Sequence, residues 1–254
     1  MNNAMAAVQR EPLVPGQPMG FTVLRVPFFL EPTYDESEDF EETNRTRLVR
    51  KWGGQAGWEA QKRAHGLKER GREVGIEHFN LDRLASSTVA SHRLVQWVTK
   101  TLGVNRAEEM YANLNSRHFE GGEKLNDREM LIEVATAVGA DPAEARRFLE
   151  SDDGLAEIRA ANQQLREIGV SGIPTLILGG KYQMPSGAIN SDYLVQAFRT
   201  IEKEGDFPRN SWILNKKMRE NGSELTPDFL DILLKSHEFW GTRGRDGEYV
   251  CRCA

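Results

Sequence analysis

The sequence has only two cysteines, Cys251 and Cys253, and both stand within the last four of its 254 residues. Folds that are held together by disulfides carry several cysteines along the chain, so the small disulfide-rich class is excluded. The longest apolar run is far shorter than the roughly 18 residues that a membrane-spanning helix requires. Residues 1–20 also lack the apolar stretch of a secretory signal. We therefore expect a soluble protein, located by default in the cytoplasm.

The sequence also has little net charge. Its 33 Lys and Arg residues stand against 38 Asp and Glu residues, which leaves a formal net charge of −5. Nucleic-acid binding needs a surface with clustered Lys and Arg. The basic residues between Arg45 and Arg72 are instead interleaved with acidic ones, which is typical of a solvated helix face. We expect neither a nucleic-acid partner nor a membrane partner.

Signals for a cofactor or a metal ion are missing as well. The pairs Gly53-Gly54 and Gly121-Gly122 lack the third glycine and the preceding strand of a phosphate-binding loop. The histidines show no paired ligand spacing, and two cysteines with one distant histidine leave a tetrahedral zinc site incomplete. The sequence therefore predicts no cofactor and no metal site.

The first third of the chain changes from no pattern to strand and then to helix. Residues 1–20 show no periodicity and are expected to be a flexible lead-in. Residues 21–30 are rich in β-branched and aromatic residues, which favours a strand, with Pro27 marking an end or an edge of it. A helical segment is expected from about Thr43 to before Gly75, with a break near Gly53-Gly54.

Between Ser87 and Gly169, apolar residues at helical spacing indicate five short helices. Asn126 stands three residues before Glu129, which is the spacing of a capping box. The sequence from Asp141 to Glu144 places an N-cap, a proline and a carboxylate in the order typical of a helix start. These helices predict a small helical domain.

A hairpin and a further helix follow. The segments 173–178 and 181–184 flank Gly179-Gly180, a pair that is typical of a hairpin turn. Asn190 or Ser191 then caps a helix. Residues 206–254 are expected to form an extension with one helix near Thr226 and a flexible tail.

Several stretches resemble a known family. Residues 169–182, with the sequence GVSGIPTLILGGKY, and the Ser186-Gly187-Ala188 that follows resemble the segment that ends the helical insertion in DsbA-like members of the thioredoxin superfamily. Residues 27–32 resemble the second strand of that family, and residues 88–94, TVASHRL, are similar to an element of its FrnE-like branch. The resemblance covers about residues 21–204.

The resemblance implies an α/β fold, in which an N-terminally incomplete thioredoxin-like sheet within residues 21–205 carries an inserted all-helical domain at about residues 83–169. It also implies a cis peptide bond between Ile173 and Pro174, an isomer that costs an X-Pro bond only about 0.5–1 kcal/mol. In the family, the residues at this proline hold an extended peptide or glutathione. Gly172, Ile173, Pro174 and Thr175 are therefore the expected substrate-binding residues, and we call them the proline wall.

The catalytic element of the family is missing from the sequence. Family chemistry uses a Cys-x-x-Cys motif at the N-terminus of the first helix, where the thiol pKa is lowered, and this sequence contains no such motif. The first strand and the helix after it also look absent. Either the catalytic unit was lost, or the start site is placed wrongly. A sheet without this strand exposes an apolar edge, which predicts a homo-oligomer or another partner that covers it.

Two other sets of residues are weaker candidates. Cys251 and Cys253 form either a substitute dithiol or, as we expect, an exposed tail with two ordinary thiols. His92 and Arg93, on a helix that starts near Thr88, either bind an anionic ligand such as glutathione or form a helix–helix hydrogen bond and a surface cation. Because of the resemblance we include both in the expected substrate-binding set.

Three functions remain open. The first is a DsbA/FrnE-type thiol–disulfide oxidoreductase family member without a bound cofactor, impaired or inactive in dithiol exchange, with no identifiable catalytic residue. The second is a glutathione-dependent transferase or isomerase of the kappa-class type, whose serine would lie in the missing segment. The third is a non-catalytic module that binds peptides at the proline wall. The expected partner is a thiol or disulfide peptide or a glutathione-like small molecule.

Overall fold

The computed structural model describes residues 1–73, 75–179, 182–205 and 248–253. It divides the chain into two compact units, one formed by residues 1–30 and 156–254 and the other by residues 31–155. The first unit is assembled from distant parts of the chain, whereas the second is continuous. The expected helix near Thr226 lies outside the described residues.

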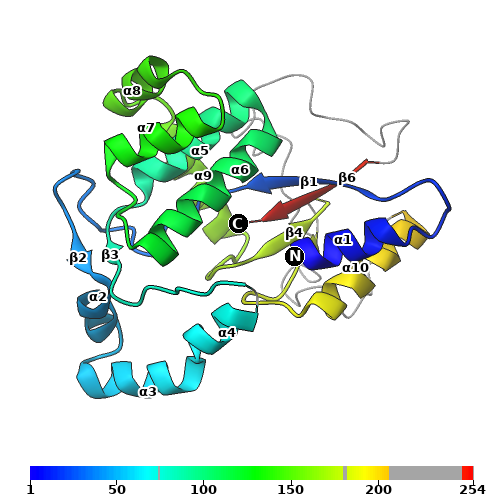
Figure 1. Cartoon of the computed structure of the whole chain (residues 1–254), viewed down its shortest axis with the longest axis horizontal. Helices are drawn as coiled ribbons and strands as arrows, with labels where there is room; N and C mark the ends of the chain where they lie inside the picture. Colours follow the sequence, from blue (N-terminus) through cyan, green and yellow to red (C-terminus); the bar gives the residue numbers. More distant parts are fainter. Residues whose placement is uncertain (74, 180–181, 206–247, 254) are drawn as a thin grey trace. The chain divides into compact units, whose positions relative to one another are not determined.

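The first unit contains a four-stranded sheet in the order β1-β6-β4-β5. Its strands are β1 (Gly20–Arg25), β4 (Leu176–Leu178), β5 (Tyr182–Gln183) and β6 (Glu248–Cys253). The last strand of the chain, β6, runs parallel to β1 and antiparallel to β4, and Figure 1 shows it in red between them. The expectation of a flexible tail is therefore wrong for residues 248–253, which form an inner strand.

Local sequence explains the limits of the other strands. The strand β1 ends two residues before Pro27, which has no N–H to donate to a ladder. Of the predicted segment 21–30, only the part before this proline is a strand, which agrees with Pro27 as an end. The hairpin of β4 and β5 is confirmed. Gly179 has a φ of 58°, a left-handed conformation that glycine adopts without steric cost.

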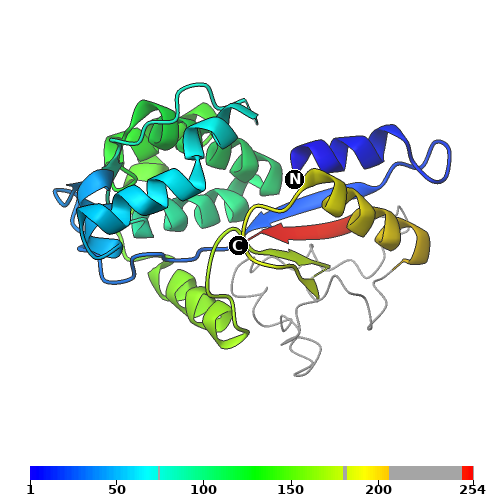
Figure 2. The same cartoon turned by 90° about the horizontal axis from the view of Figure 1, so that it is seen from below.

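Two helices cover one face of this sheet, α1 (Asn2–Arg10) and α10 (Ser191–Glu204). They lie side by side in Figures 1 and 2. Ala4 and Val8, one turn apart in α1, are fully buried in the same apolar cluster as Phe198 of α10 and Leu178 of β4. The expectation that residues 1–20 lack regular structure is thus wrong for α1, because an apolar stripe of only two small residues suffices when a second helix packs against it.

A third helix of the first unit, α9 (Leu155–Glu167), is tied to the segment that follows β1. The side-chain amide of Asn162 donates to the backbone oxygen of Pro27 at 3.4 Å, and the Arg166 guanidinium donates to that of Phe29 at 3.2 Å. The helix therefore belongs with the sheet. We expected the helical insertion to span residues 83–169, but the compact helical unit spans residues 31–155.

The second unit is mainly helical, and its sheet has only two short antiparallel strands. Its elements are β2 (Glu42–Thr43), α2 (Asn44–Lys51), α3 (Gln55–His65), α4 (Leu67–Glu73), β3 (Leu84–Ala85), α5 (Val89–Leu102), α6 (Val104–Ser116), the π-helix η1 (Arg117–Gly121), α7 (Arg128–Ala137) and α8 (Pro142–Glu150). Its core includes Leu94, Val98, Met110, Leu131, Val134 and Leu149.

Two helix starts in this unit can be compared with their sequence signals. The Asp141 side chain accepts from the N–H of Glu144, with Pro142 in the first turn of α8, as expected. For α7 the cap is Asp127, which accepts from the N–H of Met130. The expected cap, Asn126, is instead buried and donates to three backbone oxygens, those of Ser37, Glu38 and Phe40.

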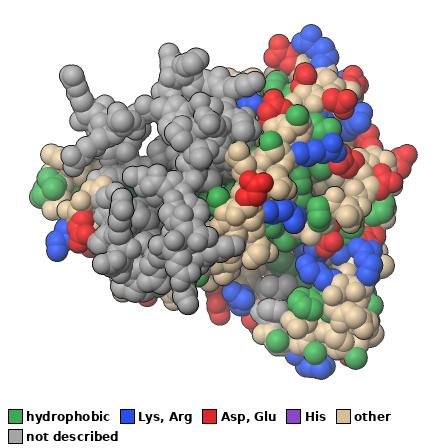
Figure 3. Space-filling view, turned by 180° about the vertical axis from the view of Figure 1, so that it is seen from behind, with side chains coloured by type: hydrophobic (Ala, Val, Ile, Leu, Met, Phe, Trp, Pro, Cys, Tyr) green, Lys and Arg blue, Asp and Glu red, His purple; other side chains and the backbone are tan. Residues whose placement is uncertain are grey.

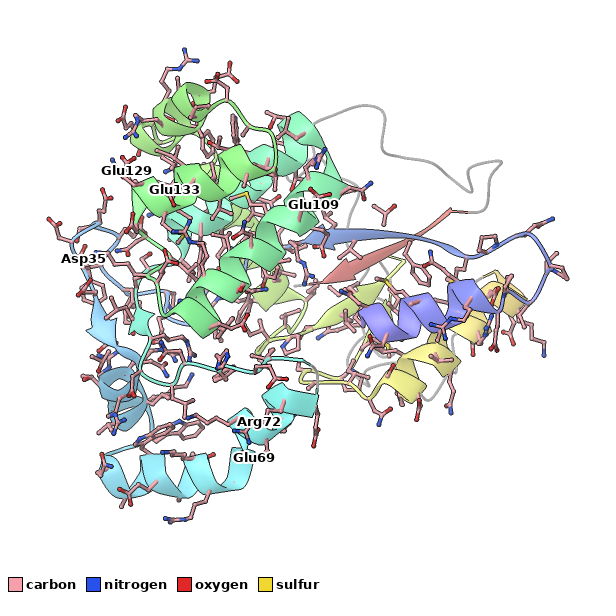
Figure 4. The ribbon with its side chains drawn as sticks, viewed as in Figure 1. Asp35, Glu69, Arg72, Glu109, Glu129 and Glu133 are labelled. Carbon is pink, nitrogen blue, oxygen red and sulfur yellow. The ribbon has the colours of Figure 1, made fainter. Side chains whose placement is uncertain are left out.

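Several charged side chains of this unit form ion pairs. Glu129 and Glu133 both extend from α7, as Figure 4 shows, and they accept from Arg146 at 2.5 Å and from Arg117 at 2.7 Å. Acidic and basic side chains are interspersed over the described part of the face that Figure 3 shows. Among the described residues, no helix has the length and apolar character that spanning a membrane requires.

Candidate functional site

The proline wall lies between α9 and β4, in the first unit. The peptide bond between Ile173 and Pro174 is cis. Ile173 is 44% exposed, whereas Thr175 is fully buried. The wall therefore exposes the apolar side chain of Ile173, while the buried side chain of Thr175 holds the wall in place.

Hydrogen bonds hold the backbone of the wall in place. The Thr175 hydroxyl donates to the backbone oxygen of Gly172 at 2.7 Å and lies 2.8 Å from the hydroxyl of Ser186. The N–H of Gly187 donates to the backbone oxygen of Pro174 at 2.9 Å. The segment after β5 thus braces the wall from the side. Ser186 and Gly187 belong to the stretch that carries the family resemblance, so the sequence did signal them, although it did not show their bracing role.

Ile173 differs from its neighbours in its backbone. Within the described part of the chain, neither its N–H nor its C=O has a hydrogen-bond partner. A backbone donor and acceptor left open beside an exposed apolar side chain can add an extended peptide as an extra strand-like segment. The wall is therefore suited to bind a peptide backbone.

The register of β6 places the two cysteines beside β4, the strand that follows the wall. Cys253 pairs with Leu176 of β4 and with Arg25 of β1, while Cys251 pairs with Leu178 and Val23. Leu176 follows Pro174 by two residues, so Cys253 stands at the end of β4 that is next to the wall. No local signal indicates this placement, because strand pairing over more than 200 residues depends on the partner strands.

His92 and Arg93 belong to α5 of the second unit. The Arg93 guanidinium donates to the backbone oxygens of Phe148, Ser151 and Asp153, at 3.0, 2.5 and 2.9 Å. It is buried, and so is not the surface cation that one of our interpretations described. Burial lowers the pKa of His92 to about 4, so this imidazole is neutral near pH 7.

The described residues contain no group of three His, Cys, Asp or Glu side chains that could hold a metal ion. The wall itself offers an open backbone donor and acceptor at Ile173, next to an exposed apolar side chain.

A thioredoxin-like sheet, a proline wall before its hairpin and a helical unit together indicate a DsbA-like protein of the thioredoxin superfamily. The sequence profile of the DSBA-like thioredoxin domain matches residues 40–199, a span that contains the wall and more than half of the chain. The chain therefore belongs to this family, and the expected fold is confirmed.

Known structures agree with this assignment. The chain is similar to a probable DsbA oxidoreductase from Streptomyces coelicolor, with 25% sequence identity and a TM-score of 0.64 over 82% of this chain and 83% of that chain. A search of curated proteins gave no match.

Proposed function

We propose that this member of the thiol–disulfide oxidoreductase family binds an extended thiol or disulfide peptide, or a glutathione-like molecule, at the proline wall, and is impaired or inactive in dithiol exchange. The observation that carries the binding part is Ile173, which is 44% exposed and whose backbone groups have no partner in the described residues. A fixed backbone loses little entropy when a peptide docks, which favours binding.

The impairment rests on the spacing and location of the cysteines. Cys251 and Cys253 are two residues apart on one strand, so the strand rise separates their Cα atoms by about 6.4–6.8 Å. This is the upper end of the range of about 4.4–6.8 Å that a disulfide usually spans. Neither cysteine lies at a helix N-terminus, where backbone charge would favour the thiolate. A cycle that closes an internal disulfide is therefore disfavoured.

The kappa-class alternative receives less support. It needs an anion-binding cation, and Arg93 was the candidate. Its guanidinium donates to three backbone oxygens at and beyond the end of α8, so a bound carboxylate would have to replace those bonds. The third alternative, a non-catalytic module that binds peptides, would use the same wall. It differs from our proposal because it would carry out no thiol exchange at all.

The binding part is tested with Ile173→Asp. This variant should weaken the binding of a fluorescent, cysteine-containing peptide by about tenfold, because a charge replaces the apolar contact and must be desolvated. Fluorescence anisotropy gives the affinity. The matched control is Val14→Asp, since Val14 is 52% exposed in the same unit but lies far along the chain from the wall. Equal weakening by both variants, or by neither, would refute the wall as the binding site.

The impairment is tested with the reduction of insulin by dithiothreitol. We expect the full chain to accelerate insulin precipitation far less than an equal amount of a DsbA-family enzyme with an intact Cys-x-x-Cys. Turnover at the rate of that enzyme would show that dithiol exchange is intact.

A further inference from the structure

The second unit holds a partly buried arginine, Arg83, that forms no ion pair with any carboxylate of the described residues. We propose that its guanidinium is the centre of a binding site for the carboxylate group of a small organic acid. We call this place the Arg83 site. It belongs to the second unit, so the inference goes beyond the proposed function and does not depend on the proline wall.

Arg83 keeps its positive charge in this position. Burial is the main cause that lowers its pKa to about 10, and repulsion from the guanidinium of Arg47 is the second cause. The side chain therefore stays protonated near pH 7. Within the described chain no carboxylate acts against these two causes. A partly buried charge without an opposite charge is costly, and an anion that binds there reduces the cost.

The carboxylates that adjoin Arg83 in the chain, or adjoin its neighbours in space, are already held by other cations. These ion pairs join Asp82 to Arg45 at 2.8 Å, Glu31 to Arg47 at 2.8 Å and Glu123 to Arg117 at 2.6 Å. A carboxylate taken from one of these pairs would leave its former partner without a counterion. The open position at Arg83 is therefore suited to a carboxylate that a ligand brings.

Hydrogen bonds to neutral acceptors orient the guanidinium. Its Nε donates to Nε2 of His118 at 3.2 Å, and its Nη1 donates to the backbone oxygen of Asn80 at 3.1 Å. The other ring nitrogen of His118 lies 2.7 Å from the backbone oxygen of Glu123, so Nδ1 carries the proton and Nε2 accepts. These bonds use two of the five N–H groups. Both N–H groups of Nη2 lack a partner in the described residues.

Aromatic rings lie next to the cation. The guanidinium carbon of Arg83 is 5.4 Å from the ring centre of Phe79 and 4.8 Å from that of Phe119, which is the range of a cation–π contact. Both rings are partly buried, so they also offer apolar surface beside the charge. Phe119 and His118 belong to η1, and π-helices are rare and often occur at functional sites. The Arg83 site thus fits an acid with an apolar body.

The backbone fixes these groups relative to one another. The N–H of Asn80 donates to the backbone oxygen of Phe119 at 2.7 Å, and the N–H of Leu84 donates to that of Gly122 at 3.0 Å. Gly122 has a φ of 89°, and a Cβ atom there would lie only 2.6 Å from the side-chain nitrogen of Asn80. The segment that carries Arg83 therefore packs directly on the end of η1. A site held in this way loses little entropy when a ligand binds.

The charge of the Arg83 site favours a carboxylate over a phosphate. A planar guanidinium binds a carboxylate through parallel N–H groups, and the two single charges compensate each other. A phosphate group carries about 1.5–2 negative charges near pH 7. The excess charge would have to be desolvated next to the rings of Phe79 and Phe119, which is unfavourable.

The first test uses the full unmodified chain and three probes: benzoate, its neutral analogue benzamide, and inorganic phosphate. Each is titrated at pH 7 and constant ionic strength, and nuclear magnetic resonance follows the backbone amides of Asn80 and Phe119. We expect benzoate to bind at least about tenfold more tightly than benzamide, because only benzoate forms a charge-assisted bond. Phosphate should bind several-fold more weakly than benzoate. Equal affinities for benzoate and benzamide, or no shift of these amides, would overturn the inference, and phosphate binding as tight as that of benzoate would refute the preference for a carboxylate.

Variants test the role of the guanidinium. Arg83→Gln should weaken benzoate binding at least about tenfold, and Arg83→Lys should weaken it several-fold, because lysine keeps the charge but lacks the planar fork. The matched control is Arg106→Gln, since Arg106 is an exposed arginine of α6 that pairs with Glu109. This variant should bind benzoate as the unmodified chain does.

The control also sets the condition for failure. Unchanged benzoate affinity in both Arg83 variants, or an equal loss in Arg106→Gln, would refute the Arg83 site. Circular dichroism shows whether Arg83→Gln still folds. If it does not fold, Arg83→Lys and the comparison of benzoate with benzamide in the unmodified chain decide the question.

Discussion

The two units of this molecule are built in different ways. The second unit is one continuous stretch, residues 31–155, in which successive helices surround a single apolar core. The first unit joins two distant segments, residues 1–30 and 156–254, and its inner strand β6 comes from the end of the chain. Local helices can form with few long-range contacts, whereas a sheet gains stability only when its strands meet. The first unit should therefore depend on one segment far more than the second.

Removal of residues 248–254 should have the largest effect. In the described sheet, β1 pairs with no strand other than β6. Each backbone hydrogen bond contributes about 1 kcal/mol net, so loss of the β1–β6 ladder should remove about 5 kcal/mol, which is comparable with the whole stability of a domain. We expect the amides of β1 and β4 to lose protection from hydrogen exchange, while those of α7 keep theirs.

Two controls sharpen this result. Val250→Pro removes a single N–H from the middle of β6 and should act in the same direction but less strongly. The double variant Cys251→Ser, Cys253→Ser keeps every backbone group and should keep β1 protected. Protection of β1 in the truncated chain would show that β6 does not hold this sheet together.

The same contrast explains what the sequence could predict. The Asp141 cap, the hairpin after Pro174 and the helix capped by Asn190 rest on residues that are neighbours in the chain, and all three were predicted. The strand β6 was missed because six residues with mixed polarity carry no signal until β1 and β4 are placed beside them.

The candidate site shows the same division. The residues of the wall were predicted from the resemblance, because they form one short motif. The pairing of Arg25 with Cys253 was not, since more than 200 residues separate the two. Arg93 was expected to bind an anion or to lie at the surface, because a sequence does not show that the oxygens of Phe148, Ser151 and Asp153 surround its guanidinium.

A fall in pH should weaken the second unit in particular. Burial is the main cause that lowers the pKa of His92 and of His118 to about 4, and both belong to this unit. Near pH 7 both are neutral in the folded and unfolded states. Below the ordinary pKa of about 6.5 the unfolded chain binds protons that the folded chain does not, so stability is lost as the pH falls from 6.5 towards 4.

At pH 5 this linkage should cost roughly 2 kcal/mol for each histidine. Urea unfolding at pH 7 and at pH 5, followed by hydrogen exchange in α7, measures the effect.

The His118 ring accepts from Arg83 at 3.2 Å and is bonded to the backbone oxygen of Glu123 at 2.7 Å, so its replacement also lowers stability at pH 7. The diagnostic result is therefore the slope: the double variant His92→Gln, His118→Gln should lose less stability between the two pH values. An unchanged slope would count against the histidines as its cause.

The smallest effect should come from the helix caps, one in each unit. Asp141 accepts from the N–H of Glu144 at the start of α8, and Asn190 accepts from the N–H of Asp192 at the start of α10. Replacing either residue by Ala should cost about 1 kcal/mol, because one backbone donor of the first turn loses its partner.

If the first unit is the more cooperative one, Asn190→Ala should lower the protection of β1 and β4 together with that of α10, whereas the effect of Asp141→Ala should stay within α8 and its neighbours. Hydrogen exchange resolves the two patterns, and a purely local effect of Asn190→Ala would mean that the sheet and its helices do not unfold as one body.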